Sequence, residues 1–89
     1  FEYQGQKCSA ASRAYIPKSL WPGVKERVVE MMRTIRVGDV RDFRNFMGAV
    51  IDEKSFTKIQ GYLDDARRNA TVVQGGGADR SAGWFVEPT

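Results

Sequence analysis

The sequence predicts an α/β fold with about two main helices and three short strands of an open sheet. Two stretches repeat apolar side chains every three or four residues, as amphipathic helices do; they cover residues 20–35 and 52–66. Three short runs bounded by Pro or Gly predict strands, at residues 13–16, 70–74 and 84–86. A chain of 89 residues is long enough for at most one domain with a modest core.

Each predicted helix has a start signal. The first is expected to begin after Ser19, whose hydroxyl suits an N-cap, and to carry Pro22 in its first turn. The second is expected to begin after Asp52, and Ile51 and Phe56 have the spacing of a hydrophobic staple around that cap. Its predicted apolar stripe consists of Phe56, Ile59, Tyr62, Leu63 and Ala66.

Two stretches read as irregular structure. Residues 38–49 form a loop in which Phe43, Phe46 and Met47 need something to bury against. The triple glycine at residues 75–77 lacks the lysine and hydroxyl of a phosphate-binding loop, and no helical pattern follows it. A flexible turn between two strands is the better interpretation.

Composition excludes several classes of function. The net charge of +3 is small and scattered, so the sequence does not predict a nucleic-acid partner. No apolar run is long enough for a membrane span, and no signal-peptide pattern is present. The chain has no histidine, which rules out a Cys-His dyad and the usual Cys/His zinc sites within it. Its start at Phe1 and its end in a strand-like run predict a piece of a longer protein.

The only cysteine, Cys8, lies among small residues and next to Lys7. Small neighbours leave room for a substrate to reach the sulfur, and a nearby positive charge favours the thiolate. Residues 5–12 are expected to form a short helix, whose N-terminus would stabilise a thiolate further. The alternative is a buried structural cysteine. A single cysteine excludes an internal disulfide and indicates a reducing compartment.

Residues 1–13, which read Phe-Glu-Tyr-Gln-Gly-Gln-Lys-Cys-Ser-Ala-Ala-Ser-Arg, resemble the catalytic-cysteine segment of aldehyde dehydrogenases. Gly5, Gln6 and Cys8 match the superfamily pattern, and the flanking residues are similar to the branch of Δ1-pyrroline-5-carboxylate dehydrogenases. The resemblance extends along the chain to the aromatic-Val-x-Pro-Thr run at residues 84–89. Residues 47–50 depart from the many members that place a proline after the glycine, and the branch is similar to this chain there.

The resemblance implies that residues 1–89 are part of a catalytic domain and that the dinucleotide-binding domain lies elsewhere. It implies that Cys8 attacks an aldehyde to give a thiohemiacetal, that hydride passes to NAD, and that water cleaves the thioester. The Cys8 backbone N–H would be one oxyanion donor. Ser9 would help to hold the substrate carboxylate, unless it merely starts a helix. Lys7 would attract the anionic substrate or bias the thiol, unless it simply faces solvent. Gln6 would order the loop.

The substrate implied by the branch is L-glutamate γ-semialdehyde, which is oxidised to glutamate in proline catabolism. The expected partners are this small aldehyde, the remainder of the protein's own chain and further copies in a homo-oligomer. The expected compartment is the bacterial cytoplasm, with the mitochondrial matrix as the alternative, and the isolated 89 residues are expected to be inactive.

Two other classes of function remain open from the residues. A non-catalytic interaction or scaffold domain would use exposed aromatic side chains as partner anchors and carry an inert Cys8; its anchors would be Trp21, Phe43, Phe46 and Trp84. A cysteine hydrolase would need a general base that this chain lacks.

Overall fold

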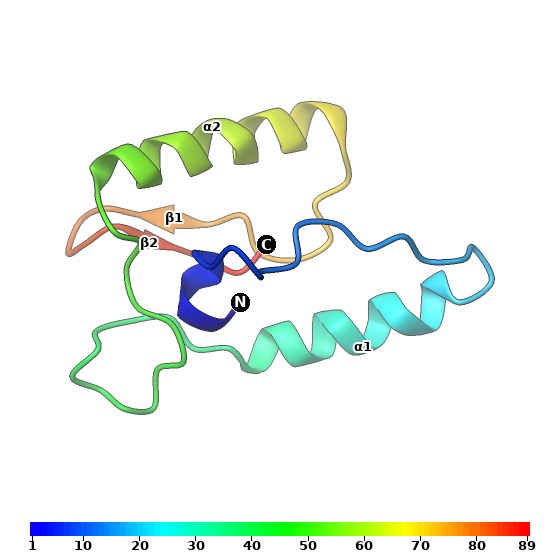
Figure 1. Cartoon of the computed structure of the whole chain (residues 1–89), viewed down its shortest axis with the longest axis horizontal. Coiled ribbons are helices and arrows are strands. Elements are labelled where there is room, and N and C mark those ends of the chain that lie inside the picture. The colour runs from blue at the N-terminus through cyan, green and yellow to red at the C-terminus, as the bar shows by residue number, and fades with distance from the viewer.

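The computed structural model describes all residues, 1–89, as helices on either side of a small hairpin (Figure 1). In chain order these are a short 3-10 helix η1 (Glu2–Gly5), the α-helices α1 (Trp21–Thr34) and α2 (Glu53–Asn69), and the strands β1 (Ala78–Asp79) and β2 (Phe85–Val86). The strands pair antiparallel, with Ala78 opposite Val86 and Asp79 opposite Phe85. Helix α2 covers one side of the hairpin and α1 lies on the other.

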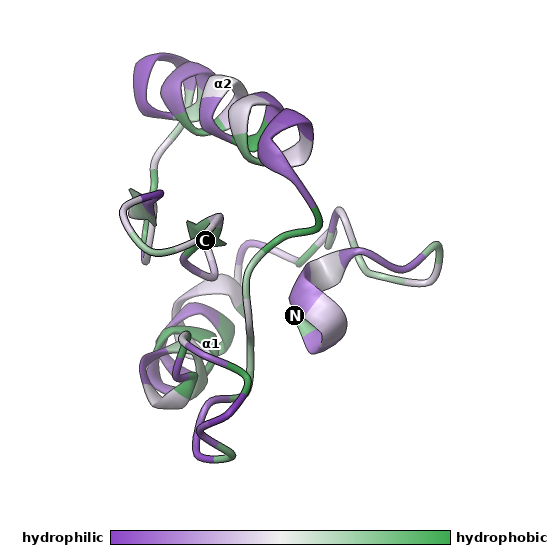
Figure 2. Cartoon of the chain, turned by 90° about the vertical axis from the view of Figure 1, so that its left-hand side faces the viewer, coloured by the Kyte–Doolittle hydropathy of each residue, from purple (hydrophilic) through white to green (hydrophobic).

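The core lies between α2 and the hairpin, and the apolar side of α2 faces it (Figure 2). Phe56 of α2 is 1% exposed and its ring centroid lies 5.5 Å from that of Trp84. The buried cluster consists of Val50, Phe56, Leu63 and Val86, with Ile59 and Trp84 packed against it. Burial of these side chains is the main force that holds α2 on the hairpin.

The predicted start of α2 is confirmed. The Asp52 carboxylate accepts a hydrogen bond from the Ser55 N–H at 2.7 Å, which satisfies one of the free amides of the first turn. The predicted staple is wrong, because Ile51 is 81% exposed while Phe56 points into the core. Asp64 and Arg67 pair on the outer face at 2.6 Å, as i,i+3 residues of a helix can.

Helix α1 forms where its periodicity predicts, with Pro22 in its first turn. Its N-cap is Leu20 without a side-chain hydrogen bond, so the predicted cap by Ser19 is wrong. None of its residues is buried, and Met31 is 69% exposed. The apolar face of α1 is therefore largely without a partner among these 89 residues. Neither helix is both long and apolar enough to cross a membrane.

The α/β class is confirmed, but the structure has two strands rather than three. Residues 13–16 and 70–74 are not strands, and β1 lies after the glycines instead. A strand needs a neighbour to receive its hydrogen bonds, and within this chain only the 78–86 hairpin supplies one. The short helix predicted over residues 5–12 is also wrong, since η1 ends at Gly5 and the chain then turns at Cys8 and Ser9.

The loop predicted between the helices is confirmed and is closed at its base by a parallel bridge between Val37 and Met47. The Gly38 N–H donates to the Met47 carbonyl at 3.0 Å. Met47 is buried, whereas Phe43 is 98% and Phe46 59% exposed. Only one of the three large apolar side chains thus finds cover.

Candidate active site

Cys8 lies at the corner of a β-turn, exposed and unpaired. The Ala10 N–H donates to the Lys7 carbonyl at 3.0 Å, so Cys8 and Ser9 occupy the two central positions of the turn. Within these 89 residues Cys8 is exposed rather than buried, and the helix expected to begin there does not form. No helix N-terminus therefore acts on the sulfur within these residues.

The backbone bends sharply just before this turn. Tyr3, Gln4 and Gly5 have positive φ values of 54°, 57° and 68°, and the Gln6 N–H closes the bend on the Tyr3 carbonyl at 3.1 Å. A left-handed conformation costs a residue other than glycine about 1–2 kcal/mol. Two such residues in succession need support from their surroundings.

Two glutamine side chains supply that support. Gln4 Nε2 donates to the Ala49 carbonyl at 3.0 Å, and Gln6 Oε1 accepts from the Ile51 N–H at 3.1 Å. The expectation that Gln6 orders the loop is confirmed. Sequence reasoning missed Gln4, whose partner lies 45 residues away and leaves no local signal.

Lys7 is not free. Its Nζ lies 2.8 Å from Oε1 of Glu2, across the bend. The Lys7 side chain is 43% exposed and that of Glu2 76%, so the pair adds little to stability but does shield the ammonium charge. Ser9 is exposed beside Cys8, and the Cys8 backbone N–H has no acceptor within the chain. The three predicted site residues thus share one turn, with a thiol, a hydroxyl and a free amide at its surface.

The strongest electrostatic effects lie in the loop after α1. Asp39 accepts hydrogen bonds from the Arg41 backbone and guanidinium, and this side-chain hydrogen bond lowers the pKa of Asp39 from 3.8 to about 2. Asp42 likewise accepts hydrogen bonds from the Arg44 backbone and guanidinium, and the side-chain hydrogen bond lowers the pKa of Asp42. The repeated Asp-x-Arg pattern at residues 39–44 is the signal that sequence reasoning overlooked.

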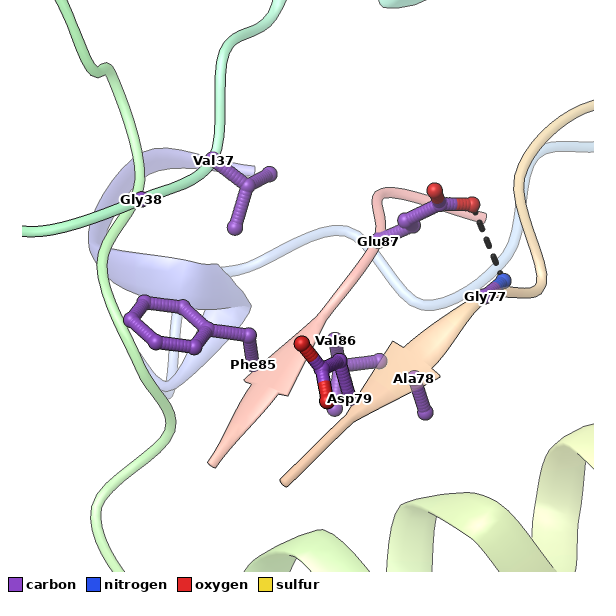
Figure 3. A pocket seen from close by; sticks show the side chains of 8 residues that line it. All are labelled: Val37, Gly38, Gly77, Ala78, Asp79, Phe85, Val86 and Glu87. Atoms are coloured by element: carbon purple, nitrogen blue, oxygen red, sulfur yellow. Dashed lines mark hydrogen bonds between the residues drawn. The ribbon is translucent and has the colours of Figure 1, made fainter. Parts of the chain in front are cut away.

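A pocket of about 420 Å³ opens between Val37–Gly38 and the hairpin (Figure 3). Cys8 does not line it. At its rim the Glu87 carboxylate accepts from the Gly77 N–H at 2.9 Å. In the adjoining turn Thr89 Oγ1 accepts from the Gly76 N–H at 2.8 Å, so two of the three glycine amides are bound by the chain itself. The triple glycine leads into β1, but no strand precedes it, so the predicted turn between two strands is wrong.

The pattern of the Aldehyde dehydrogenase family matches residues 1–89, so the chain belongs to the aldehyde dehydrogenase family. Within the family it is 54% identical, over its full length, to the mitochondrial Delta-1-pyrroline-5-carboxylate dehydrogenase of Dictyostelium discoideum. It is 43% identical, also over its full length, to the 1-pyrroline-5-carboxylate dehydrogenase 1 of Halalkalibacterium halodurans.

The fold agrees with this assignment. The crystal structure of the Delta-pyrroline-5-carboxylate dehydrogenase from Mycobacterium tuberculosis superposes with a TM-score of 0.89 at 42% identity, covering 97% of this chain and 16% of that one. The same enzyme has been solved with NAD bound. This chain also spans 16% of the Dictyostelium protein and 17% of the Halalkalibacterium one.

Proposed function

We propose that this chain is the cysteine-bearing part of an NAD-dependent aldehyde dehydrogenase that oxidises L-glutamate γ-semialdehyde, derived from Δ1-pyrroline-5-carboxylate, to glutamate. The observation that carries the proposal is the exposed turn with Cys8 at its corner, in a chain of this family. The names of its relatives support the choice of substrate.

The turn suits nucleophilic attack on an aldehyde. The Cys8 Sγ adds to the carbonyl carbon, and the free Cys8 N–H is a donor for the oxyanion that forms. Loss of hydride from this adduct leaves a thioester, which water cleaves to release the acid and the thiol. We assign Ser9, which is exposed next to Cys8, as a donor to the substrate carboxylate, and Lys7 adds a shielded positive charge nearby.

We propose that other parts of the protein bind the nucleotide; the Gly76 and Gly77 amides already donate to Thr89 and Glu87 within this chain. We propose NAD as the hydride acceptor because a relative has been solved with it, and its contacts are assigned to other parts of the protein.

The remainder of the chain and further copies of it are the proposed partners of the exposed α1 face. We propose the bacterial cytoplasm or the mitochondrial matrix as the compartment; the name of the Dictyostelium relative includes "mitochondrial", which supports the second.

The scaffold alternative loses two of its supports. Trp84 is half-buried against Phe56 rather than an exposed anchor, and Cys8 is not buried. Trp21, Phe43 and Phe46 do remain exposed.

The test is turnover by the full-length protein. NADH formation with L-glutamate γ-semialdehyde should fall by several powers of ten in Cys8→Ser, which keeps the size but replaces the thiol with a far less acidic hydroxyl. Ser12→Ala, in the same segment, is the control and should leave the rate unchanged. NAD dependence excludes a cysteine hydrolase. Near-normal aldehyde oxidation by Cys8→Ser would refute the proposal.

A further inference from the structure

The geometry points to Gln4 and Gln6 as a pair of positioning residues that hold the Cys8 turn in its working place, an inference that rests on the proposed function. Both side chains reach segment 49–51, and each partner lies 45 residues further along the chain. Gln4 donates to a carbonyl there, and Gln6 accepts from an amide. The two side chains thus replace the backbone hydrogen bonds that a neighbouring strand would make.

Segment 49–51 is attached to the hydrophobic core through its middle residue. Its middle residue, Val50, is 5% exposed and belongs to the core cluster. The Val50 N–H donates to the Trp84 carbonyl at 2.8 Å, next to β2. The contacts of Gln4 and Gln6 flank Val50 on either side, so the segment just before the cysteine turn is attached to the buried core.

The fold also makes room for the Gln4 amide. Gly48 is buried, and a β-carbon there would lie 3.1 Å from Gln4 Nε2 and 3.0 Å from Val40 Cγ1. Because glycine has no such atom, the amide can reach the Ala49 carbonyl beside it. Gly48 therefore leaves the space that the hydrogen bond from Gln4 to Ala49 needs.

The bend at residues 3–5 explains why the tethers matter. Tyr3 and Gln4 adopt a left-handed conformation that is disfavoured without support, and Cys8 follows only a few residues later. Releasing either tether lets the bend relax toward ordinary backbone angles and displaces the turn. Attack by sulfur needs the reacting atoms close and aligned, so such a displacement lowers kcat rather than the affinity for cofactor.

The two positions have opposite chemical requirements, which gives a matched test. Position 4 must donate, whereas position 6 must accept. Glutamate keeps the acceptor but loses the donor. Gln6→Glu should therefore retain the tether, while Gln4→Glu sets a carboxylate against the Ala49 carbonyl. Both variants add the same charge close to Cys8, so a difference between them reports the hydrogen bond.

The experiment measures kcat and KM in the full-length protein. Gln4→Glu, Gln4→Ala and Gln6→Leu should each lose about fivefold to tenfold in kcat, the size of one lost hydrogen bond, with KM for NAD unchanged. Gln6→Glu should keep more of kcat than Gln4→Glu, because the added charge is common to both variants and only the tether differs. Gln60→Leu, a control on α2, should stay within about twofold of the wild type. Equal losses in Gln4→Glu and Gln6→Glu, or full kcat in Gln6→Leu, would overturn the inference.

Amide hydrogen exchange provides a readout that needs no turnover. Exchange of the Ile51 N–H should quicken about tenfold in Gln6→Leu and remain slow in Gln6→Glu. Unchanged protection of Ile51 in Gln6→Leu would contradict the tether whatever the activity. A wild-type protein with this exchange pattern but without NAD-dependent turnover would refute the proposed function and leave the tethers in place.

Discussion

A β-carbon built on Gly75 would lie 2.0 Å from the carbonyl oxygen of Pro88, far inside contact distance. Gly75 also has a φ of +77°, which side chains rarely adopt. The turn before β1 therefore closes directly on the end of the chain. Arg67 of α2 donates to the Gly76 carbonyl and ties the same turn to the helix.

Gly75→Ala should consequently destabilise the full-length protein by about 2 kcal/mol or more, through the left-handed backbone and the clash together. The measurement is the free energy of unfolding from a denaturant titration. Gly61→Ala is the matched control, because it lies on the exposed face of α2 with no atom within 4 Å of its β-carbon. It should be neutral or stabilising by about 0.5–1 kcal/mol. Equal effects at the two glycines would contradict the close contact.

The isolated 89-residue chain should show weak or absent cooperative unfolding and no dehydrogenase activity. Only eight of its residues are buried, and α1 contributes none of them. Large apolar side chains such as Met31 and Phe43 are exposed, and the entropy cost of ordering them is not offset by burial. Circular dichroism during heating would test this. A sharp two-state melt would show that these residues are self-sufficient.

The parts of the fold that depend on neighbours in sequence could be predicted. The spacing of Phe56 and Leu63 and the cap at Asp52 located α2, because these features act within one or two turns. The strands were harder, since β-structure depends on a partner that local composition does not specify. Tyr3 and Gln4 carry no signal for a left-handed backbone, so η1 was missed.

The candidate site likewise has a part that local sequence predicts and a part that it does not. Cys8, Ser9 and Lys7 could be found because they are adjacent in one recognisable segment. The tether from Gln4 to Ala49 could not, because it joins residues that only the folded chain brings together. Sequence motifs thus locate the candidate reacting group, whereas the contacts around it are visible only in the folded chain.

Asp39 should titrate at an unusually low pH. Its folded-state pKa is lowered from 3.8 to about 2, mainly by the Arg41 side-chain hydrogen bond. The stability that this pair contributes is therefore present above pH 3.8 and is lost as the pH falls through about 2. Carboxyl NMR of the full-length protein should show the low midpoint, and Arg41→Gln should move it back toward 3.8. The pKa of Asp42 should stay lowered in that variant, because Arg44 remains; an unmoved Asp39 midpoint would contradict the pairing.

Ser9 should act in substrate recognition. It lies beside Cys8 at the exposed corner of the turn, so its hydroxyl can point to the carboxylate of a substrate whose aldehyde is at the sulfur. Ser9→Ala should weaken kcat/KM for L-glutamate γ-semialdehyde by roughly 1–2 kcal/mol, about the size of a hydrogen bond to a charged group. Ser9→Thr keeps the hydroxyl and should retain more of the rate.

The control for Ser9 is a second substrate. A simple aliphatic aldehyde has no carboxylate, so Ser9→Ala should change its kcat/KM much less than that of the semialdehyde. Ser12→Ala, an exposed serine in the same segment, should affect neither substrate. A merely structural role would lower both rates together, because a displaced Cys8 attacks every aldehyde less well. Equal losses on the two substrates would therefore remove Ser9 from recognition and place it with the residues that shape the turn.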